Sequence, residues 1–316
     1  MSHDSPLLLY FPQWQGSGDE DLIFRGSETL KGFLASDLGV NLTTIGAPPH
    51  IKTEDEQASQ KANSDWIRNY SILSLYHRHA ANTITANSPK KIFTLGGDCG
   101  IELAPIRYLN SIYGGDLAVV WLDAHADLNT PSTSPSKTYH GMILRALLET
   151  FEVTDQVPGE LVVNPVPDFV TSTVTSPLLP KQVFLAGVRD LDPAEKEYIA
   201  RQDIAVVKCE ELEHHQGNVL VDMLRKGGFS KVYIHVDADV LSLGDFDSVM
   251  CPTPGGIRTR TLKEVIKDIK QADGIEVVGG SLVEVTNTND DKVPYRDMAT
   301  IFASLWLELL SPKPIR

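Results

Sequence analysis

The chain has 316 residues, 42% of them hydrophobic, which is enough for a large core and allows one or two domains. Its 28 basic and 42 acidic residues give a formal charge of −14. This balance argues against nucleic acid or an anionic membrane as a partner, because both need clustered Lys and Arg. Three scattered cysteines make no disulfide framework, and no apolar segment could span a bilayer. We therefore expect a cytoplasmic protein.

Short apolar runs alternate along the chain with segments of helical periodicity. Strands are predicted at Leu7–Phe11, 91–95, Leu117–Leu122, 181–186, 232–236, 275–278 and 282–285. Helices are predicted at 64–81, 141–149, 192–201, 261–271 and 296–310, and a surface excursion at 152–180. The alternation predicts an α/β fold with a mainly parallel sheet and helices on both faces. No repeat or domain boundary is found, so residues 1–316 are expected to form a single domain.

Two acidic clusters follow predicted strands: Asp123-Ala-His125-Ala-Asp127 and Asp237-Ala-Asp239. Every second residue of an extended chain points to one face, so these side chains should converge. Converging carboxylates at the ends of buried strands repel one another, and cations remove that conflict. The pattern therefore predicts a metal site, and the number of carboxylates indicates two ions.

Other polar residues also lie at the carboxyl ends of predicted strands, namely Asp98 with Cys99, the segment 189–192, and Glu284. Open parallel sheets bind their ligands beyond these ends. Oxygen-rich sites with an imidazole suit divalent ions such as Mn²⁺. Two ions bridged by a carboxylate can lower the pKa of a shared water, which gives a hydroxide at neutral pH. The sequence thus favours a hydrolase that has no protein nucleophile.

The chain resembles the ureohydrolase (arginase/agmatinase) family in four blocks, which follow in the family's order. The blocks are Gly96-Gly97-Asp98-Cys99, Asp123 to Asp127, His235 to Asp239, and Leu282 to Val285. The resemblance implies a three-layer α/β/α fold of the arginase/deacetylase type and two Mn²⁺ ions per chain. It implies that Asp123 and Asp237 bridge the ions, that His125 and Asp239 complete one, and that Asp127 and Cys99 complete the other.

The resemblance extends to residues that hold an amino-acid substrate. It implies that Asn129, Ser136 and Asp192 hold its α-carboxylate and α-amino groups, with Glu195 following in the same segment. It also implies that Glu284 holds the guanidinium group, that His140 shuttles protons, and that Thr253 lies near the guanidinium. Singly, Asn129 could be a turn residue, Asp192 a helix cap and His140 an ordinary loop histidine. Their joint spacing favours the functional interpretation.

Cys99 departs from the family pattern, which has a histidine at this position. Either one ligand is lost, or the cysteine binds the metal as a thiolate. Two divalent ions carry +4 and the four aspartates −4, so a thiolate makes the cluster −1 and its metals weaker Lewis acids. A hydroxylated guanidine is less basic and accepts a weaker nucleophile. Family members with this cysteine resemble Nω-hydroxyarginine amidinohydrolases.

We therefore expect a hydroxide bridging two metals to hydrolyse the guanidino group of L-arginine or Nω-hydroxy-L-arginine, giving ornithine and urea or hydroxyurea. One alternative is another guanidino or formimino substrate, such as agmatine or formiminoglutamate; agmatine lacks the α-carboxylate that Asn129 and Ser136 would hold. Another is a catalytically silent family member that serves as a binding subunit. A homo-oligomer is expected by resemblance alone, since no assembly motif is visible.

Overall fold

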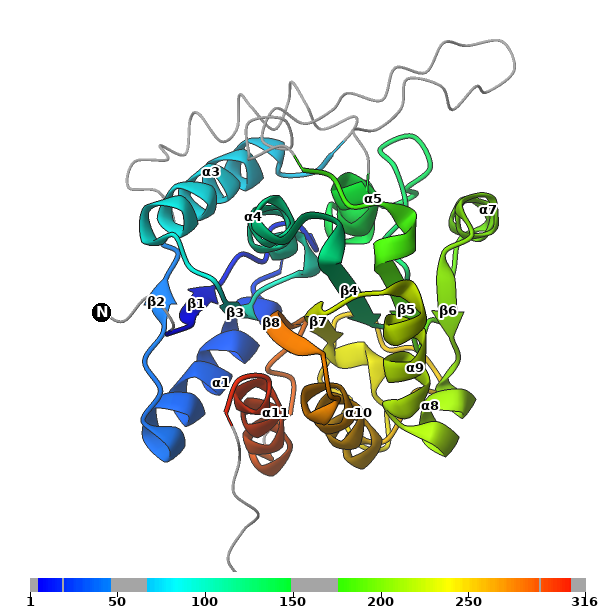
Figure 1. Ribbon diagram of the computed structural model, residues 1–316. Helices are drawn as coiled ribbons and strands as arrows, with labels where there is room; N and C mark the ends of the chain where they lie inside the picture. The colour runs from blue at the N-terminus through cyan, green and yellow to red at the C-terminus, as the bar shows by residue number, and fades with distance from the viewer. Residues whose placement is uncertain (1–4, 19, 47–66, 149–175, 290, 308–316) are drawn as a thin grey trace, which may run out of the picture.

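The computed structural model describes residues 5–18, 20–46, 67–148, 176–289 and 291–307. Within these ranges eight strands form one sheet in the order β2-β1-β3-β8-β7-β4-β5-β6, and every neighbouring pair is parallel (Figure 1). The strands are β1 Leu7–Phe11, β2 Thr43–Thr44, β3 Ile92–Gly96, β4 Leu117–Leu122, β5 Val183–Ala186, β6 Ala205–Val207, β7 Lys231–Asp237 and β8 Glu276–Val283.

Helices cover both faces of the sheet, as Figure 1 shows. One layer holds α3 Tyr70–Asn87, α4 Leu103–Tyr113, α5 Ile143–Leu148 and α7 Pro193–Gln202. The other holds α1 Leu22–Leu38, α8 Cys209–His215, α9 Asn218–Gly227, α10 Thr259–Gln271 and α11 Val293–Ser304. The predicted three-layer α/β/α fold with a parallel sheet is confirmed.

Successive side chains of a strand enter opposite layers, because a strand has a period of two. On β7, Val232, Ile234 and Val236 pack towards α8 to α11, whereas Tyr233 packs towards α3 to α5. His235 and Asp237 share the parity of Tyr233 and so face the α3–α5 layer. This direction matters because the acidic clusters lie on the same side.

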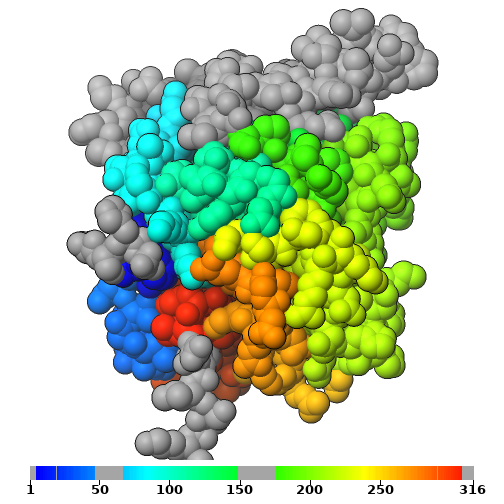
Figure 2. Space-filling view, viewed as in Figure 1, coloured from blue at the N-terminus to red at the C-terminus, as the bar shows by residue number. Residues whose placement is uncertain are grey.

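Helices α1 and α11, which lie near opposite ends of the chain, pack side by side on one face of the sheet. In Figure 2 the blue surface of α1 borders the red surface of α11. Arg296 on α11 places Nε 3.2 Å from Oδ2 of Asp37 on α1. No helix within the described ranges combines the length and the apolar composition that a bilayer span requires.

Several predicted boundaries differ from the structure, and the largest differences are in three elements. The helix predicted from residue 64 begins at Tyr70, because Asn69 has a left-handed backbone with φ 56° that a right-handed helix excludes. The two strands predicted at 275–278 and 282–285 are one strand, β8, which runs through Gly279 and Gly280. The last helix begins at Val293 and ends at Ser304, and its predicted end at 310 lies outside the described residues.

Candidate metal centre and substrate pocket

The predicted donors come from neighbouring strands of the sheet centre. β3, β8, β7 and β4 lie side by side, and Cys99, Glu284, Asp237 and Asp123 follow or end them at the same edge. Each of these four side chains is buried. The sheet order therefore brings together residues that are up to 185 positions apart, as in the hydrogen bond from the Cys99 amide to Glu284.

The turn after β3 presents Cys99 through the side chain of Asp98. Asp98 is buried and accepts hydrogen bonds from the amides of Gly16 and Gly100, both at 2.8 Å, and from Nε2 of Gln13 at 3.1 Å. A Cβ on Gly97 would lie 1.6 Å from the Gln13 carbonyl oxygen, so only glycine permits this close approach. Asp98 thus stabilises the turn through its hydrogen bonds, and Cys99 is the residue of this turn that is available to bind a metal.

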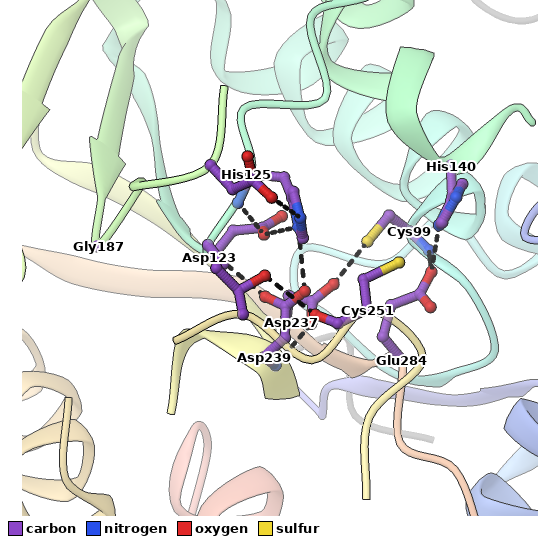
Figure 3. Close-up of polar contacts among 12 residues, drawn as sticks. Cys99, Asp123, His125, His140, Gly187, Asp237, Asp239, Cys251 and Glu284 are labelled. Atoms are coloured by element: carbon purple, nitrogen blue, oxygen red, sulfur yellow. Dashed lines mark hydrogen bonds and ion pairs between the residues drawn. The ribbon is translucent and has the colours of Figure 1, made fainter. Parts of the chain in front are cut away.

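One donor group consists of Asp123, His125 and Asp239, whose ligand atoms all lie within 4.8 Å of one another. His125 Nδ1 is 3.0 Å from Asp239 Oδ2 and 3.5 Å from Asp123 Oδ1 (Figure 3). Burial lowers the pKa of His125, but the two carboxylates outweigh it and raise the pKa overall. All three are among the four residues predicted to hold one of the two ions, and the fourth is Asp237.

Cys99 joins the centre from the other side. Its Sγ donates to Asp237 Oδ2 at 3.1 Å (Figure 3). Cys99, Asp237 and Glu284 form a second donor group, and Cys99, Asp123 and His235 form a third. Asp127 belongs to none of the three groups, but it lines the adjoining pocket.

The electrostatics of the cluster favour bound cations. Burial and then the neighbouring carboxylates raise the pKa of Asp127 and Asp237 well above the usual range, and that of Asp239 to about 6. Asp127 Oδ2 and Glu284 Oε2 are buried with no hydrogen-bond partner among the described residues. Unpaired oxygens in a crowd of carboxylates fit divalent cations, because a cation satisfies them and removes the repulsion.

A pocket opens above this cluster, and it brings together all of the residues predicted to bind metal or substrate except Asp123 and Thr253. Its lining residues are Cys99, His125, Asp127, Asn129, Ser134, Pro135, Ser136, Thr138, His140, Gly141, Asp190, Asp192, Glu195, Asp237, Asp239, Cys251 and Glu284. Asp123 lies buried beneath it.

Glu284 and His140 form a pair within this pocket. His140 Nδ1 is 3.1 Å from Glu284 Oε1, which also accepts from the Cys99 amide (Figure 3). Burial lowers the pKa of His140, but the Glu284 carboxylate outweighs it and raises the pKa. A carboxylate with one free oxygen beside a titratable imidazole can bind a guanidinium group and move a proton.

The residues predicted to hold the α-amino and α-carboxylate groups of a substrate, Asn129, Ser136 and Asp192, form one polar wall of the pocket. Asn129 Nδ2 donates to Asp192 Oδ2 at 2.9 Å. Glu195 accepts from the amides of Asp192 and Leu128, both at 2.9 Å, so it fixes the segments on which Asp192 and Asn129 lie. The Ser136 hydroxyl is 2.6 Å from Thr138 Oγ1. Amide, hydroxyl and carboxylate groups are thus available to a zwitterionic ligand.

Thr253, which was predicted to lie near the guanidinium group, is not among the residues that line the pocket. Its hydroxyl donates to the Cys251 carbonyl at 3.1 Å, and Cys251 lines the pocket instead. The sequence interpretation also overlooked Glu102 and His235, which are buried beside the cluster. His235 lies two residues before Asp237 on β7, so the period of the strand could have indicated that both face one way.

Fold and site together define an α/β protein with a buried acidic centre, whose donor atoms suit divalent cations, and a polar ligand pocket. The model of the Arginase family matches residues 39–311, and the chain belongs to this family of amidinohydrolases.

Curated relatives include the arginases of Plasmodium berghei and Plasmodium falciparum. The first is 29% identical over 282 residues, covering 83% of this chain and 75% of that protein. The second is 30% identical over 264 residues, covering 78% of this chain and 60% of that protein, so the chain spans less than two thirds of its length.

Solved structures share the fold. Entamoeba histolytica arginase, in complex with L-ornithine, has a TM-score of 0.76 at 20% identity, covering 96% of this chain and 99% of that one. Formimidoylglutamase from Bacillus subtilis has a TM-score of 0.66 at 18% identity, covering 96% and 86%.

Proposed function

We propose that this chain hydrolyses the guanidino group of an arginine-type amino acid, L-arginine or Nω-hydroxy-L-arginine, to ornithine and urea or hydroxyurea. The observation that supports this most directly is Glu284, whose Oε2 is buried and unpaired among the described residues while its Oε1 is held by His140 and Cys99. A carboxylate held in this way suits a guanidinium. The wall of Asn129 and Asp192 in the same pocket favours a substrate with α-amino and α-carboxylate groups.

Two divalent ions, Mn²⁺ by expectation, would be held by the six residues with donor atoms around the cluster: Cys99, Asp123, His125, Asp127, Asp237 and Asp239. When bound, such ions lower the pKa of a shared water and stabilise developing negative charge. The remaining chemistry falls to side chains of the chain itself.

Asp127 and His140 have the proton-transfer roles in this proposal. Asp127 Oδ2 is buried and unpaired among the described residues, so it can accept a proton from the attacking water and orient it. His140 is held against Glu284 and lines the pocket, so it can donate a proton to the leaving amine. Asp192 would bind the α-amino group, and Asn129 with Ser136 the α-carboxylate.

Cys99 favours Nω-hydroxyarginine as a second candidate beside arginine. Its sulfur lies 3.1 Å from Asp237 Oδ2, inside the ring of carboxylates. A thiolate there adds −1 to the four aspartate charges. The bound metal ions would then be weaker Lewis acids and would activate water less strongly. A neutral hydroxyguanidine is attacked more readily than a guanidinium under these conditions.

The decisive measurement is the steady-state rate with Mn²⁺ on arginine, Nω-hydroxyarginine, agmatine and formiminoglutamate, together with the metal content. We expect release of urea or hydroxyurea from the first two substrates. Two bound ions with no turnover of either would refute the proposal. A preference for agmatine, which lacks the α-carboxylate, would contradict the substrate-binding roles of Asn129 and Ser136. A chain that binds no metal would favour a catalytically silent binding subunit.

Replacing Cys99 by histidine tests the charge argument. The Cys99→His variant should raise the ratio of kcat/KM for arginine to that for Nω-hydroxyarginine by roughly tenfold, about 1.4 kcal/mol in relative transition-state energy. Cys209→Ser is the control, because Cys209 is half-buried and its Sγ donates to the Gly187 carbonyl, outside the pocket lining. An unchanged ratio in Cys99→His would contradict the role of the thiolate charge.

A further inference from the structure

Three buried donors lie close together, and one of them, Cys99, lines the pocket. The Cys99 sulfur, an Asp123 carboxylate oxygen and a His235 ring nitrogen all lie within 4.8 Å of one another. They come from the 3₁₀ turn Cys99–Glu102, from the residue after β4, and from within β7. The proposed function uses the first two and leaves His235 without a role.

The ring of His235 is held in one orientation. Its Nδ1 is 2.8 Å from Glu102 Oε1, and Tyr233 donates its hydroxyl to Glu102 Oε2 at 2.6 Å. The ring also stacks on Trp121, with centroids 3.6 Å apart. A carboxylate at Nδ1 places the imidazole proton there, so the lone pair of the neutral ring lies on Nε2.

That Nε2 atom is aimed at other electron-rich atoms. It is buried and has no hydrogen-bond partner among the described residues. Asp123 Oδ2 lies 3.8 Å away, too far for a hydrogen bond. A lone pair and a carboxylate that face each other in a buried site cost free energy unless a proton or a metal cation lies between them.

The local backbone explains why these groups occur together. Cys99 and Glu102 are the first and last residues of one 3₁₀ turn. Residues three apart in a 3₁₀ helix eclipse one another, so both side chains leave on the same side. One turn thus supplies a thiol and the carboxylate that orients the imidazole, which is the usual support of a metal-binding histidine.

We propose that Nε2 of His235 is a further protein ligand of the metal centre, which binds one divalent ion together with Cys99 and Asp123, and that Glu102 is its positioning residue. This inference rests on the proposed function only in requiring a metal-loaded centre. A sulfur and an imidazole beside the carboxylates favour Zn²⁺ or Co²⁺ over Mn²⁺ at this position.

X-ray absorption of the full chain loaded with Zn²⁺ tests the ligand count without any substitution. Two imidazoles, from His125 and His235, and one sulfur per pair of ions are expected. One imidazole per pair would overturn this inference and leave the proposed function intact. A chain that binds no metal ion would overturn both.

Substitutions test the same point through metal affinity, measured by titrating the chelator-treated chain with Zn²⁺. His235→Gln should weaken one of two binding steps by more than tenfold, and Glu102→Gln by roughly 10- to 100-fold. His77→Gln is the matched control, because His77 is a buried histidine on α3, in the helix layer that His235 faces. This variant should bind both ions as the wild type does. Wild-type affinity in a folded His235→Gln chain, with folding checked by circular dichroism, would overturn the inference.

Discussion

Asp127 is the residue whose replacement should lower the turnover rate, kcat, most directly. Its Oδ2 is buried and unpaired among the described residues, and burial with the Asp123 charge raises its pKa. Asp127→Asn keeps the shape but removes the charge and the proton acceptor, so kcat should fall by roughly 10²- to 10⁴-fold. Asp297→Asn, the same change on the exposed face of α11, should leave kcat as it is. Equal rates in both variants would refute the role given to Asp127.

His77 makes the stability of the chain depend on pH. Burial, and then the charge of Arg107, lowers its pKa to about 3, from 6.5 in an unfolded chain. Between these values the unfolded chain binds a proton that the folded chain does not, so the free energy of unfolding falls as pH decreases from 6.5 to 3. This group should contribute a loss of about 2 kcal/mol between pH 7 and pH 5.

Urea unfolding at pH 7 and pH 5 measures that loss. His77→Gln should show a smaller difference between the two pH values than the wild type by about that amount, and comparing differences removes any pH-independent cost of the substitution. His79→Gln, on the same helix but only half-buried, retains His77 and should keep the wild-type difference. A wild-type difference in His77→Gln would show that this histidine does not set the acid sensitivity.

The spacing of the sequence predicted most of the centre at the level of residues. Asp123, His125, Asp237 and Asp239 could be placed because period-two clusters after apolar runs leave few alternatives. The pairing of Glu102 with His235 could not be predicted, because it joins residues 133 positions apart through the register of the sheet. Thr253 was named by resemblance alone, and the path of its loop is decided by contacts such as that from Arg189 to the Thr253 carbonyl.

Strand β8 depends on a glycine beneath the centre. A Cβ on Gly279 would lie 2.5 Å from the Tyr233 ring and 2.8 Å from the Ile92 carbonyl oxygen. Gly279→Ala should therefore lower the free energy of unfolding by about 1–3 kcal/mol, the usual cost of overpacking. Gly32→Ala on α1, where a Cβ meets nothing within 4 Å, should raise it by up to about 1 kcal/mol. A neutral Gly279→Ala in denaturant unfolding would contradict the packing argument.

The six inner strands of the sheet could be predicted from sequence, whereas the edge strands β2 and β6 could not. β4 is a continuous apolar run, and residues 232–236 of β7 are apolar except for His235; both segments are buried on both faces, which is a strong signal. β6 has three residues and an exposed middle, and the short helices α8 and α9 were not predicted either. Gly279 and Gly280 divided β8 in the prediction because glycine normally interrupts strands, whereas here close packing requires it.

Metal removal should weaken the whole molecule. Four buried aspartates share one edge of the sheet, and ions that bind only the folded chain stabilise it by about 2.7 kcal/mol at a hundredfold excess over Kd. Treatment with a chelator should therefore lower the thermal unfolding temperature, and Mn²⁺ should restore it. In Asp237→Ala the difference should shrink, because one of the proposed metal ligands is absent. Identical unfolding temperatures with and without bound ions would contradict a native-state metal centre.

The fold class followed from the alternation of apolar runs and amphipathic segments, since that order leaves a parallel sheet as the simplest solution. The strand order did not follow, because β8 lies between β3 and β7 although it is last in the chain. This crossover brings Glu284 to the centre of the sheet. The pocket therefore depends on the strand order, which local sequence patterns do not predict.

Asp127 and Glu284 both have a left-handed backbone, with φ of 54° and 61°. Such conformations favour glycine or asparagine and cost a side-chain-bearing residue free energy, most of all a long one such as glutamate. A laboratory selection for heat resistance of the metal-free chain should therefore enrich replacements at these two positions, and every such replacement would remove a reactive group. At Asp127 and Glu284, a substitution that relieves backbone strain also removes a group needed for turnover. A stabilised and active variant must therefore be sought at other positions in the chain.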